Sequence, residues 1–285
     1  MPVLTPEDHA FFEKNGYLLV RNVIPKEDCD AVIAAIFEFL GMDPEDPEDW
    51  YRPPLKPGGM VEMYQHQALW NTRQNPKLYT IFTEILGRKD LWVTIDRVGF
   101  KPPRHPDHPE YDHTGFVHWD TDTSILPQPF GVQGVLYLSD TDEHMGGFCC
   151  IPGFHGKALE AWIAEQPADR NPYAPDLSRL PPGMQVTPIP GNAGDFVIWN
   201  SLLAHGNGRN VSTRPRFSQY ISMFPACYED EAQRQHRIHC WQHRLPPGNE
   251  VFPGDPREIE QKYFTTATLT PLGRKLLGLD PWDVV

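Results

Sequence analysis

Cysteine is scarce in this sequence, and no long hydrophobic run occurs in it. The 285 residues include five cysteines, and no pair of them has CxxC spacing. A disulfide framework is therefore not expected, and a reducing compartment, the cytoplasm, fits best. No stretch approaches the ~18 consecutive apolar residues of a membrane-spanning helix. The first residues, MPVLTPEDHAFFEKNGY, have neither the basic nor the apolar region of a signal peptide, so none is expected.

Positive charge is also in short supply. Lysine and arginine number 25 against 38 aspartates and glutamates, which gives a formal net charge of -13 and a sequence pI of about 5.3. This acidity argues against a nucleic acid or an anionic membrane surface as the main partner. A small-molecule substrate is expected instead, and a local basic pocket for one small anion stays compatible with the net charge. The composition leaves the oligomeric state open.

Thirty-one prolines and 22 glycines punctuate the chain and favour many short strands and loops. In the first part, helices are nonetheless predicted at residues 6–15, 26–40 and 76–86, with a strand at 17–21. Residues 43–58 are rich in proline and acid and are predicted to form a loop. A further short helix is predicted in TPLGRKLLGLDPW, where a threonine cap precedes a proline.

From residue 91 the pattern changes to short apolar runs bounded by Gly, Pro or Asp. Five runs are predicted to be strands: LWVTIDRVGF, GVQGVLYLSD, GGFCCIPG, GDFVIWNSLLAH and RFSQYISMFPA. The adjacent Cys149 and Cys150 are interpreted as core residues of a strand rather than redox groups. The order of elements predicts one α+β domain over 1–285, with a helical part at about 1–90, an antiparallel β-sandwich or barrel at about 91–225, and a C-terminal extension at about 226–285.

A segment between the strands departs from this pattern. KALEAWIAEQ is predicted to be a helix, and PADRNPYAPDLSRLPPG after it is long for a connection without regular structure. Two interpretations stay open for residues 166–183: a lid that closes over a site, or a packed surface insertion.

The segment Phe116-Val117-His118-Trp119-Asp120 is the first candidate for a functional site. Side chains two positions apart on a strand point to the same face, so His118 and Asp120 are able to bind one ion together. Two histidines and one carboxylate are the ligands of non-haem Fe(II) oxygenases. An H-x-D triplet alone is weak evidence in a chain with 12 histidines. The histidines in the polar or proline-rich segments are interpreted as solvated or hydrogen-bonded side chains: His105, His108, His113, His236, His239 and His243.

A second segment, AHGNGRNVSTRPRFS at residues 204–218, strengthens the hypothesis. His205 follows an apolar run and is interpreted as the third metal ligand. One of the arginines after it is interpreted as the anchor of a dicarboxylate co-substrate, because the planar guanidinium binds carboxylates bidentately. The alternative is a strand-end histidine beside surface arginines.

Three arginines compete for the anchoring role, and Arg216 is favoured. Arg209 lies in a Gly-Arg-Asn turn, where side chains usually reach solvent, and Pro215 indicates that regular strand pairing starts only after Arg214. From Arg216 onward, alternate residues form a polar face. Ser218, on that face, is a candidate hydroxyl donor to the same carboxylate.

With these segments the chain resembles the phytanoyl-CoA dioxygenase family of Fe(II)- and 2-oxoglutarate-dependent oxygenases. The resemblance extends to FFEKNGYLLVRNVIP, GVLYLSDTDEHMGGFCCIPGFH and GNAGDFVIWNSLLAHGNGRNVSTRPRFS, and it covers most of residues 10–225. It implies a double-stranded β-helix, or cupin-like jelly roll, with flanking helices and with iron between its two sheets. By position, it implies that His118, Asp120 and His205 bind the iron and that Arg216 binds 2-oxoglutarate.

Two positions depart from the family pattern. Some members carry Trp on the strand after the first ligands, near the position of Val135 here, and Gln133 on the same face is a candidate for a polar contact instead. Many members have Ser two residues after the distal histidine, where this chain has Asn207. Both Gln133 and Asn207 are therefore candidates for contact with the co-substrate.

The resemblance implies an enzyme that uses Fe(II), 2-oxoglutarate and O2, most simply to hydroxylate a small organic molecule, with release of succinate and CO2. Asp120 argues against halogenation, since halogenases of such families lack this carboxylate; desaturation stays open. Two alternatives remain: a cupin-like metalloenzyme that does not use 2-oxoglutarate, and a non-catalytic binding protein on the same fold. The substrate is not evident from the sequence, and the candidates for its pocket are Tyr64, His66, Arg97, His113 and Asp122.

Overall fold

The computed structural model describes residues 2–282 of the chain. Most helices lie in the first and last parts of the sequence, and α5 lies among the strands of the middle part. The helices are α1 (Pro6–Asn15), α2 (Lys26–Leu40), α3 (Gln67–Arg73), α4 (Pro76–Leu86), α5 (Gly156–Ala164), α6 (Glu231–His243), α7 (Ile259–Tyr263) and α8 (Pro271–Leu277). The strands are β1 (Tyr17–Val20), β2 (Met60–Val61), β3 (Leu91–Val93), β4 (Val98–Lys101), β5 (Val117–His118), β6 (Val132–Tyr137), β7 (Phe148–Cys150), β8 (Thr187–Pro188), β9 (Phe196–Asn200), β10 (His205–Asn207), β11 (Arg216–Tyr220) and β12 (Met223–Pro225).

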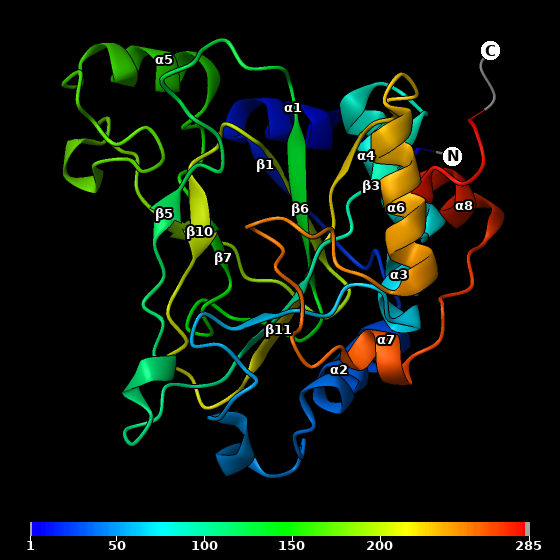
Figure 1. Ribbon diagram of the computed structural model, residues 1–285. Helices are drawn as coiled ribbons and strands as arrows, with labels where there is room; N and C mark the ends of the chain where they lie inside the picture. Colours follow the sequence, from blue (N-terminus) through cyan, green and yellow to red (C-terminus); the bar gives the residue numbers. More distant parts are fainter. Residues whose placement is uncertain (1, 283–285) are drawn as a thin grey trace.

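The strands form antiparallel sheets. The largest has the order β1-β9-β6-β11-β4-β2, a smaller one has the order β5-β10-β7-β8, and β12 pairs with β3. Figure 1 shows the smaller sheet on one side of the large sheet and most helices on the other, including α2, α3, α4, α6 and α8. The predicted mixture of helices and antiparallel sheet is therefore confirmed.

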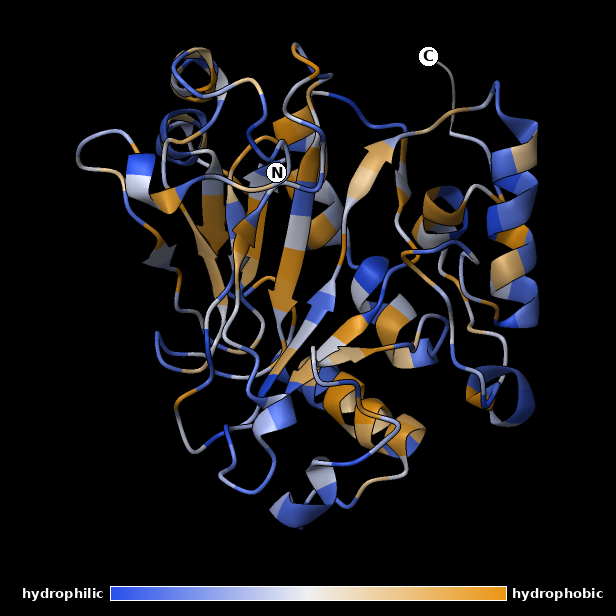
Figure 2. Cartoon of the chain, turned by 60° about the vertical axis from the view of Figure 1, so that its left-hand side comes forward, coloured by the Kyte–Doolittle hydropathy of each residue, from blue (hydrophilic) through white to orange (hydrophobic). Residues whose placement is uncertain are grey.

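Alternation along the strands of the large sheet divides the core into two parts. Val135 and Tyr137 of β6, with Val197 and Trp199 of β9, pack in one cluster together with residues of β7. Their neighbours in the sequence, such as Leu136, pack against the helices in the main cluster. Because successive side chains of a strand point to opposite faces, one set lies between the two sheets and the other lies under the helices. Figure 2 shows this hydrophobic character along the strands.

Local signals explain why several predicted helices have the expected bounds. Thr5 caps α1 in a capping box with Asp8, and Gly16 ends the helix in the left-handed conformation. Asn75 caps α4 immediately before a proline, and Gly87 ends it in the same left-handed way. The helices at 6–15, 26–40 and 76–86 were thus predicted correctly, as was the short closing helix.

Three of the predicted strands were too long. The run from residue 91 forms β3 and β4, and the run from 216 forms β11 and β12. β4 pairs with β11, and β3 pairs with β12, but the register shifts by one residue between the two pairings. A one-residue shift of this kind is typical of a β-bulge, which interrupts regular pairing. Each of the two predicted strands is therefore divided into two shorter strands. Similarly, GDFVIWNSLLAH contains β9, a turn and then β10, so His205 begins a strand rather than ending one.

Three helices were not predicted. α3 and α7 are short, and α6 has polar residues around most of its circumference, so none of the three has a strong apolar repeat. In α6 the sequence signal is instead the Asp230 side chain, which accepts a hydrogen bond from the backbone of Gln233. Among residues 2–282, no helix is long and apolar enough to cross a membrane.

Candidate active site

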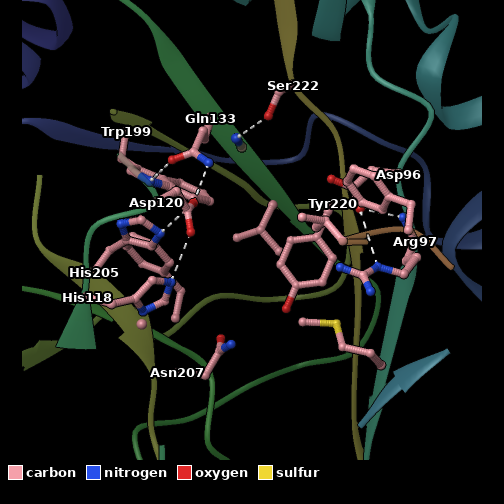
Figure 3. A pocket seen from close by; sticks show the side chains of 17 residues that line it. Asp96, Arg97, His118, Asp120, Gln133, Trp199, His205, Asn207, Tyr220 and Ser222 are labelled. Carbon is pink, nitrogen blue, oxygen red and sulfur yellow. Dashed lines mark hydrogen bonds and ion pairs between the residues drawn. The ribbon is translucent and has the colours of Figure 1, made fainter. Parts of the chain in front are cut away.

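The first group of functional candidates comes together at the paired ends of β5 and β10. His205 lies directly opposite His118 in the antiparallel register, and Asp120 stands in the bend just after β5. The Nε2 atom of His118 lies 3.2 Å from Oδ1 of Asp120, and the Nε2 atom of His205 lies 3.5 Å from Oδ2. Figure 3 shows the three side chains converging on one point at the wall of a pocket. Their potential donor atoms all lie within 4.8 Å of one another.

The donor chemistry of this trio fits a divalent metal ion such as iron. The Nδ1 atom of His205 lies 2.9 Å from the carbonyl oxygen of Leu203. With the Nδ1 proton donated to that carbonyl, the lone pair of Nε2 is free to face an ion. Burial is the largest single influence and opposes ionisation of Asp120, but its contacts with the His118 and His205 imidazoles and with Gln133 outweigh burial and hold the pKa of the carboxyl well below its usual range. Two imidazoles and one ionised carboxylate form the ligand set of non-haem Fe(II) sites.

Gln133 of β6 holds the carboxylate of Asp120 in place. Its amide nitrogen donates a hydrogen bond of 2.6 Å to Oδ2 of Asp120, and its carbonyl oxygen accepts one of 3.1 Å from the indole of Trp199. Gln133 therefore lies beside the candidate metal ligands, on the strand face that lines the space between the sheets (Figure 3). Such contacts orient a ligand carboxylate toward the ion.

A cavity of about 380 Å³ opens beside the trio. Aromatic and apolar side chains, among them Trp199 and Phe148, cover its wall near the histidines, and Asn207 also lines it. The opposite wall carries Asp96 and Arg97, and burial raises the pKa of Asp96 to about 6 (Figure 3). The cavity thus combines apolar walls with a few polar groups, as small-molecule sites do.

A second cavity of about 280 Å³ adjoins the first and shares His118, Asn207 and Tyr220 with it. Arg216 lines the second cavity and is only 5% exposed. Its guanidinium donates to Oγ of Ser218 at 2.6 Å, so the two predicted co-substrate residues lie in direct contact. Neither residue touches solvent to any great extent, which suits a water-excluding anion site.

The two competing arginines lie elsewhere. Arg214 is 55% exposed along its side chain and pairs with Asp142 at 2.9 Å. Arg209 pairs with Asp112 on the surface. Neither lines either cavity.

Two of the five weaker candidates for the substrate pocket line a cavity, and three do not. Arg97 lines the larger cavity and His113 the smaller one. The other three do not line either cavity. Tyr64 is buried and donates its hydroxyl to Glu62, His66 caps α3 by accepting from Ala68, and Asp122 accepts hydrogen bonds from Ser124 in a local turn. These three predictions were wrong because their side chains satisfy local hydrogen bonds instead.

Several cavity residues were missed from the sequence, and three of them matter for the chemistry of the site. Lys101 lines the smaller cavity, and Asp96 and Phe252 line the larger one. A lysine that ends an otherwise apolar run was a usable signal for Lys101, since β4 is buried throughout. Phe252 comes from the C-terminal extension, and nothing in its local sequence points to the cavity.

A second cluster of histidines does not fit a metal site. Glu48, His105 and His108 lie close enough to one another to share an ion. However, Nδ1 of His105 accepts a hydrogen bond from the backbone of Asp107, so Nε2 carries the proton and faces Glu48 at 3.3 Å. A protonated nitrogen has no lone pair for a metal. This cluster is therefore a hydrogen-bonded surface group, as predicted for His105 and His108.

Comparison with known proteins identifies the family. The family model described as phytanoyl-CoA dioxygenase (PhyH) matches residues 12–218, which is well over half of the chain. The chain belongs to the phytanoyl-CoA dioxygenase family. The resemblance found in the sequence is thereby confirmed, and so is the expectation of a family of iron- and 2-oxoglutarate-dependent oxygenases.

The relatives share a low sequence identity with this protein but match it over most of its length. A protein of Dictyostelium discoideum that bears the family's name is 27% identical over 80% of this chain and 78% of its own. Ectoine dioxygenase of Bordetella bronchiseptica is 24% identical over 77% of this chain and 76% of its own. Among solved structures, the epimerase SnoN in complex with Fe3+, alpha-ketoglutarate and nogalamycin RO has a TM-score of 0.55 at 17% identity, over 93% of this chain and 94% of its own. This last likeness concerns the fold.

Proposed function

We propose that this protein is an Fe(II)- and 2-oxoglutarate-dependent oxygenase that hydroxylates a small organic molecule, with release of succinate and CO2. The observation that carries the proposal is the convergence of His118, Asp120 and His205 on one point at the wall of the larger cavity. A site of this kind with a carboxylate ligand supports oxygen transfer rather than halogenation.

Each residue of the site has a role in this proposal. His118, Asp120 and His205 hold the iron, which together with 2-oxoglutarate and O2 supplies the oxidising chemistry. Gln133 orients the Asp120 carboxylate through its 2.6 Å hydrogen bond. In the adjoining cavity Arg216, with Ser218 and Asn207 close by, binds the co-substrate and so fixes its reactive end toward the metal ligands.

The proposal extends to the finer architecture. Two antiparallel sheets with a hydrophobic cluster between them, and with metal ligands at one end of that space, are the features of a double-stranded β-helix. We infer this jelly-roll topology for the core at about 91–225, within a single domain over 1–285. The strand β1 from the N-terminal part, which pairs with β9, supports a single unit.

The substrate is inferred to be small and partly polar. A cavity of about 380 Å³ lies within the usual range for small-molecule sites, and besides the candidate metal ligands it carries Asp96 and Arg97, whose charges have opposite signs. The names of the relatives include substrates as different as ectoine and phytanoyl-CoA, so we do not extend either to this chain. All five cysteines are free thiols, which supports a location in the reducing cytoplasm.

A substrate screen tests this function directly. Wild-type protein with Fe(II) and 2-oxoglutarate is incubated with a library of small metabolites, and succinate is measured against the background without substrate. At least one compound should raise succinate release and gain one oxygen atom, and His205→Ala should abolish both. Turnover of a compound without any need for 2-oxoglutarate would instead favour a cupin-like metalloenzyme. Failure to bind Fe(II) and 2-oxoglutarate would favour a non-catalytic binding protein.

A further inference from the structure

Two buried cations face each other in the smaller cavity. Lys101 of β4 is the direct register partner of Arg216 of β11, and each residue is 5% exposed. Like charges at directly opposite positions of an antiparallel pair destabilise it. The arrangement therefore calls for a negatively charged group near the two side chains.

Among residues 2–282, no carboxylate forms an ion pair with Lys101 or Arg216; Asp112 interacts with Lys101 only at longer range and is itself paired with Arg209. The Nζ atom of Lys101 donates to the carbonyl oxygen of Gly208 at 2.6 Å. The guanidinium of Arg216 donates to Ser218 and to the carbonyl oxygen of Gly146, and its buried Nε has no hydrogen-bond partner in the described chain. All of these acceptors are neutral. They satisfy hydrogen bonds but leave the two cations without a directly paired carboxylate in a buried space, which is costly.

The space beside the two cations is kept open. Gly99 precedes Lys101 by two positions and so lies on the same strand face. A Cβ atom at Gly99 would lie 2.7 Å from Oγ of Ser218 and 3.4 Å from Nη1 of Arg216. Any side chain there would crowd the Arg216–Ser218 pair. The absence of a side chain leaves room for a ligand at the guanidinium.

The cavity also leads to the candidate iron ligands. Its wall includes Lys101 and Arg216 together with His118, and it adjoins the larger cavity through residues shared by both. An anion held by the two cations can therefore extend toward the metal site. A linear dicarboxylate has this shape, with one carboxylate for the cations and a second end for the metal.

The charge state of Lys101 agrees with a cavity built for an anion. Burial is the main cause that lowers its pKa to about 7, and the neighbouring Arg216 lowers it further. The ligand-free cavity thus disfavours the second positive charge. A bound carboxylate would favour it again.

We propose that Lys101 is a second ligand, beside Arg216, of the distal carboxylate of 2-oxoglutarate. This inference rests on the proposed function. It assigns to the co-substrate site a lysine on a strand of the large sheet that faces the arginine, so that the carboxylate lies between two cations instead of on one.

The test compares two ligands on three proteins. Calorimetry under anaerobic conditions measures the affinity of the Fe(II)-loaded protein for 2-oxoglutarate and for its 5-methyl ester, which lacks the distal charge. The proteins are the wild type, Lys101→Met, and a control, Lys89→Met, which removes an exposed lysine remote from both cavities. Thermal melting of the ligand-free proteins is measured in parallel.

Lys101→Met should bind 2-oxoglutarate roughly 10- to 100-fold more weakly, the value of one charge-assisted hydrogen bond, and should bind the ester as the wild type does. The ligand-free variant should still melt in a cooperative transition, which shows that it folds. Lys89→Met should change none of these quantities.

Each other outcome has a distinct meaning. Equal affinity of wild type and Lys101→Met for 2-oxoglutarate overturns the role of Lys101 and leaves the proposed function intact. Equal weakening for 2-oxoglutarate and its ester shows that Lys101 is structural and also overturns the inference. No binding of 2-oxoglutarate to the wild type overturns the proposed function itself.

Discussion

His205 is the most enclosed of the three candidate iron ligands, with a side chain that is 6% exposed against 26% for His118 and 49% for Asp120. Its ring lies in contact with the aromatic side chains of Trp199 and Phe148. Water cannot easily replace it as a ligand. Loss of this imidazole should therefore weaken Fe(II) binding by more than the roughly 10- to 100-fold that is typical when only an outer contact of a ligand is removed. Anaerobic Fe(II) titration of His205→Ala measures this loss.

The matched control is His239→Ala, which removes an exposed histidine of α6. That variant should bind Fe(II) like the wild type. If His205→Ala kept wild-type affinity, His205 would not be a ligand, and the trio would have to be replaced by another set of donors.

A second prediction at the residue scale separates the arginines. Arg216 is buried in the smaller cavity, whereas Arg214 is exposed and paired with Asp142. Truncation of one partner of a buried ionic contact costs ~2–5 kcal/mol, so Arg216→Gln should raise the KM for 2-oxoglutarate by tens-fold or more and leave Fe(II) binding nearly unchanged. Arg214→Gln, measured in the same assay, should have much less effect. The reverse pattern would assign the co-substrate to Arg214.

The third prediction concerns pH and follows from Lys101. Its pKa of about 7 in the ligand-free protein lies below the ordinary value of 10.5, so much of it is uncharged above pH 7. A bound carboxylate raises that pKa, and binding then takes up a proton. The affinity for 2-oxoglutarate should consequently fall as pH rises above 7, by at most about tenfold per pH unit. Calorimetry in buffers of different ionisation enthalpy measures the proton uptake.

The other groups around Lys101 do not titrate in this interval. Burial raises the pKa of Cys149 to about 11, and burial with the two cations lowers the pKa of His113 below its usual value. The Arg209 guanidinium keeps the pKa of Asp112 low. Lys101→Met should remove the slope between pH 7 and 9. A slope that persisted in this variant would have to come from a different group.

At the scale of elements, the sequence was most informative where two local signals coincided. The helices at 6–15 and 76–86 have both a side-chain cap and a terminal glycine, and their bounds agree with the structure. Composition indicated the apolar runs from residue 91 onward as strands. It did not predict where these strands end, because a β-bulge depends on how a strand pairs with its partner. α6 escaped recognition because its residues are polar on most sides.

The same limit applies to the candidate site. His118, Asp120, His205 and Arg216 stand in short segments whose residue order carries the family pattern, so the sequence alone made them candidates. The contact between Gln133 and Asp120 joins residues 13 positions apart, and Lys101 meets Arg216 across a strand pair. Such contacts depend on register, which one sequence does not specify. Phe252 lines the cavity from the C-terminal extension, and its local sequence does not indicate this contact either.

The segment 166–183 was interpreted from the sequence either as a lid or as a packed surface insertion, and hydrogen exchange distinguishes the two. It does not line either cavity, but it holds the chain next to the metal ligands: the carbonyl of Tyr173 accepts from the backbone of Trp119, and Arg170 donates to Thr123. If it acts as a lid, its hydrogen exchange should slow when Fe(II), 2-oxoglutarate and substrate bind. Residues 246–256, which include the cavity residue Phe252, serve as the comparison. Strong and equal protection of 166–183 with and without ligands would make it a packed surface insertion.

At the scale of the whole molecule, the C-terminal extension is part of the same core as the N-terminal helices. The main hydrophobic cluster includes both Leu4 and Leu277. The Arg237 side chain of α6 is buried and donates to the carbonyl oxygen of Val93 in β3 and to that of Leu277. Glu260 of α7 accepts hydrogen bonds from the backbone of residues 64 and 65. These links join elements that are far apart in the sequence.

One cooperative unfolding transition is therefore expected for the full chain, and its midpoint should depend on ligands. Calorimetry should give equal calorimetric and van't Hoff enthalpies, because the main hydrophobic cluster takes residues from both ends of the chain. Fe(II) together with 2-oxoglutarate at about 100-fold above its dissociation constant should add about 2.7 kcal/mol, which corresponds to roughly 5–10 °C in Tm. His205→Ala should still unfold in one transition but lose most of the shift caused by Fe(II). Two separate transitions, with only one of them raised by the ligands, would instead mean that residues 226–285 form an independent unit and that the site is built without them.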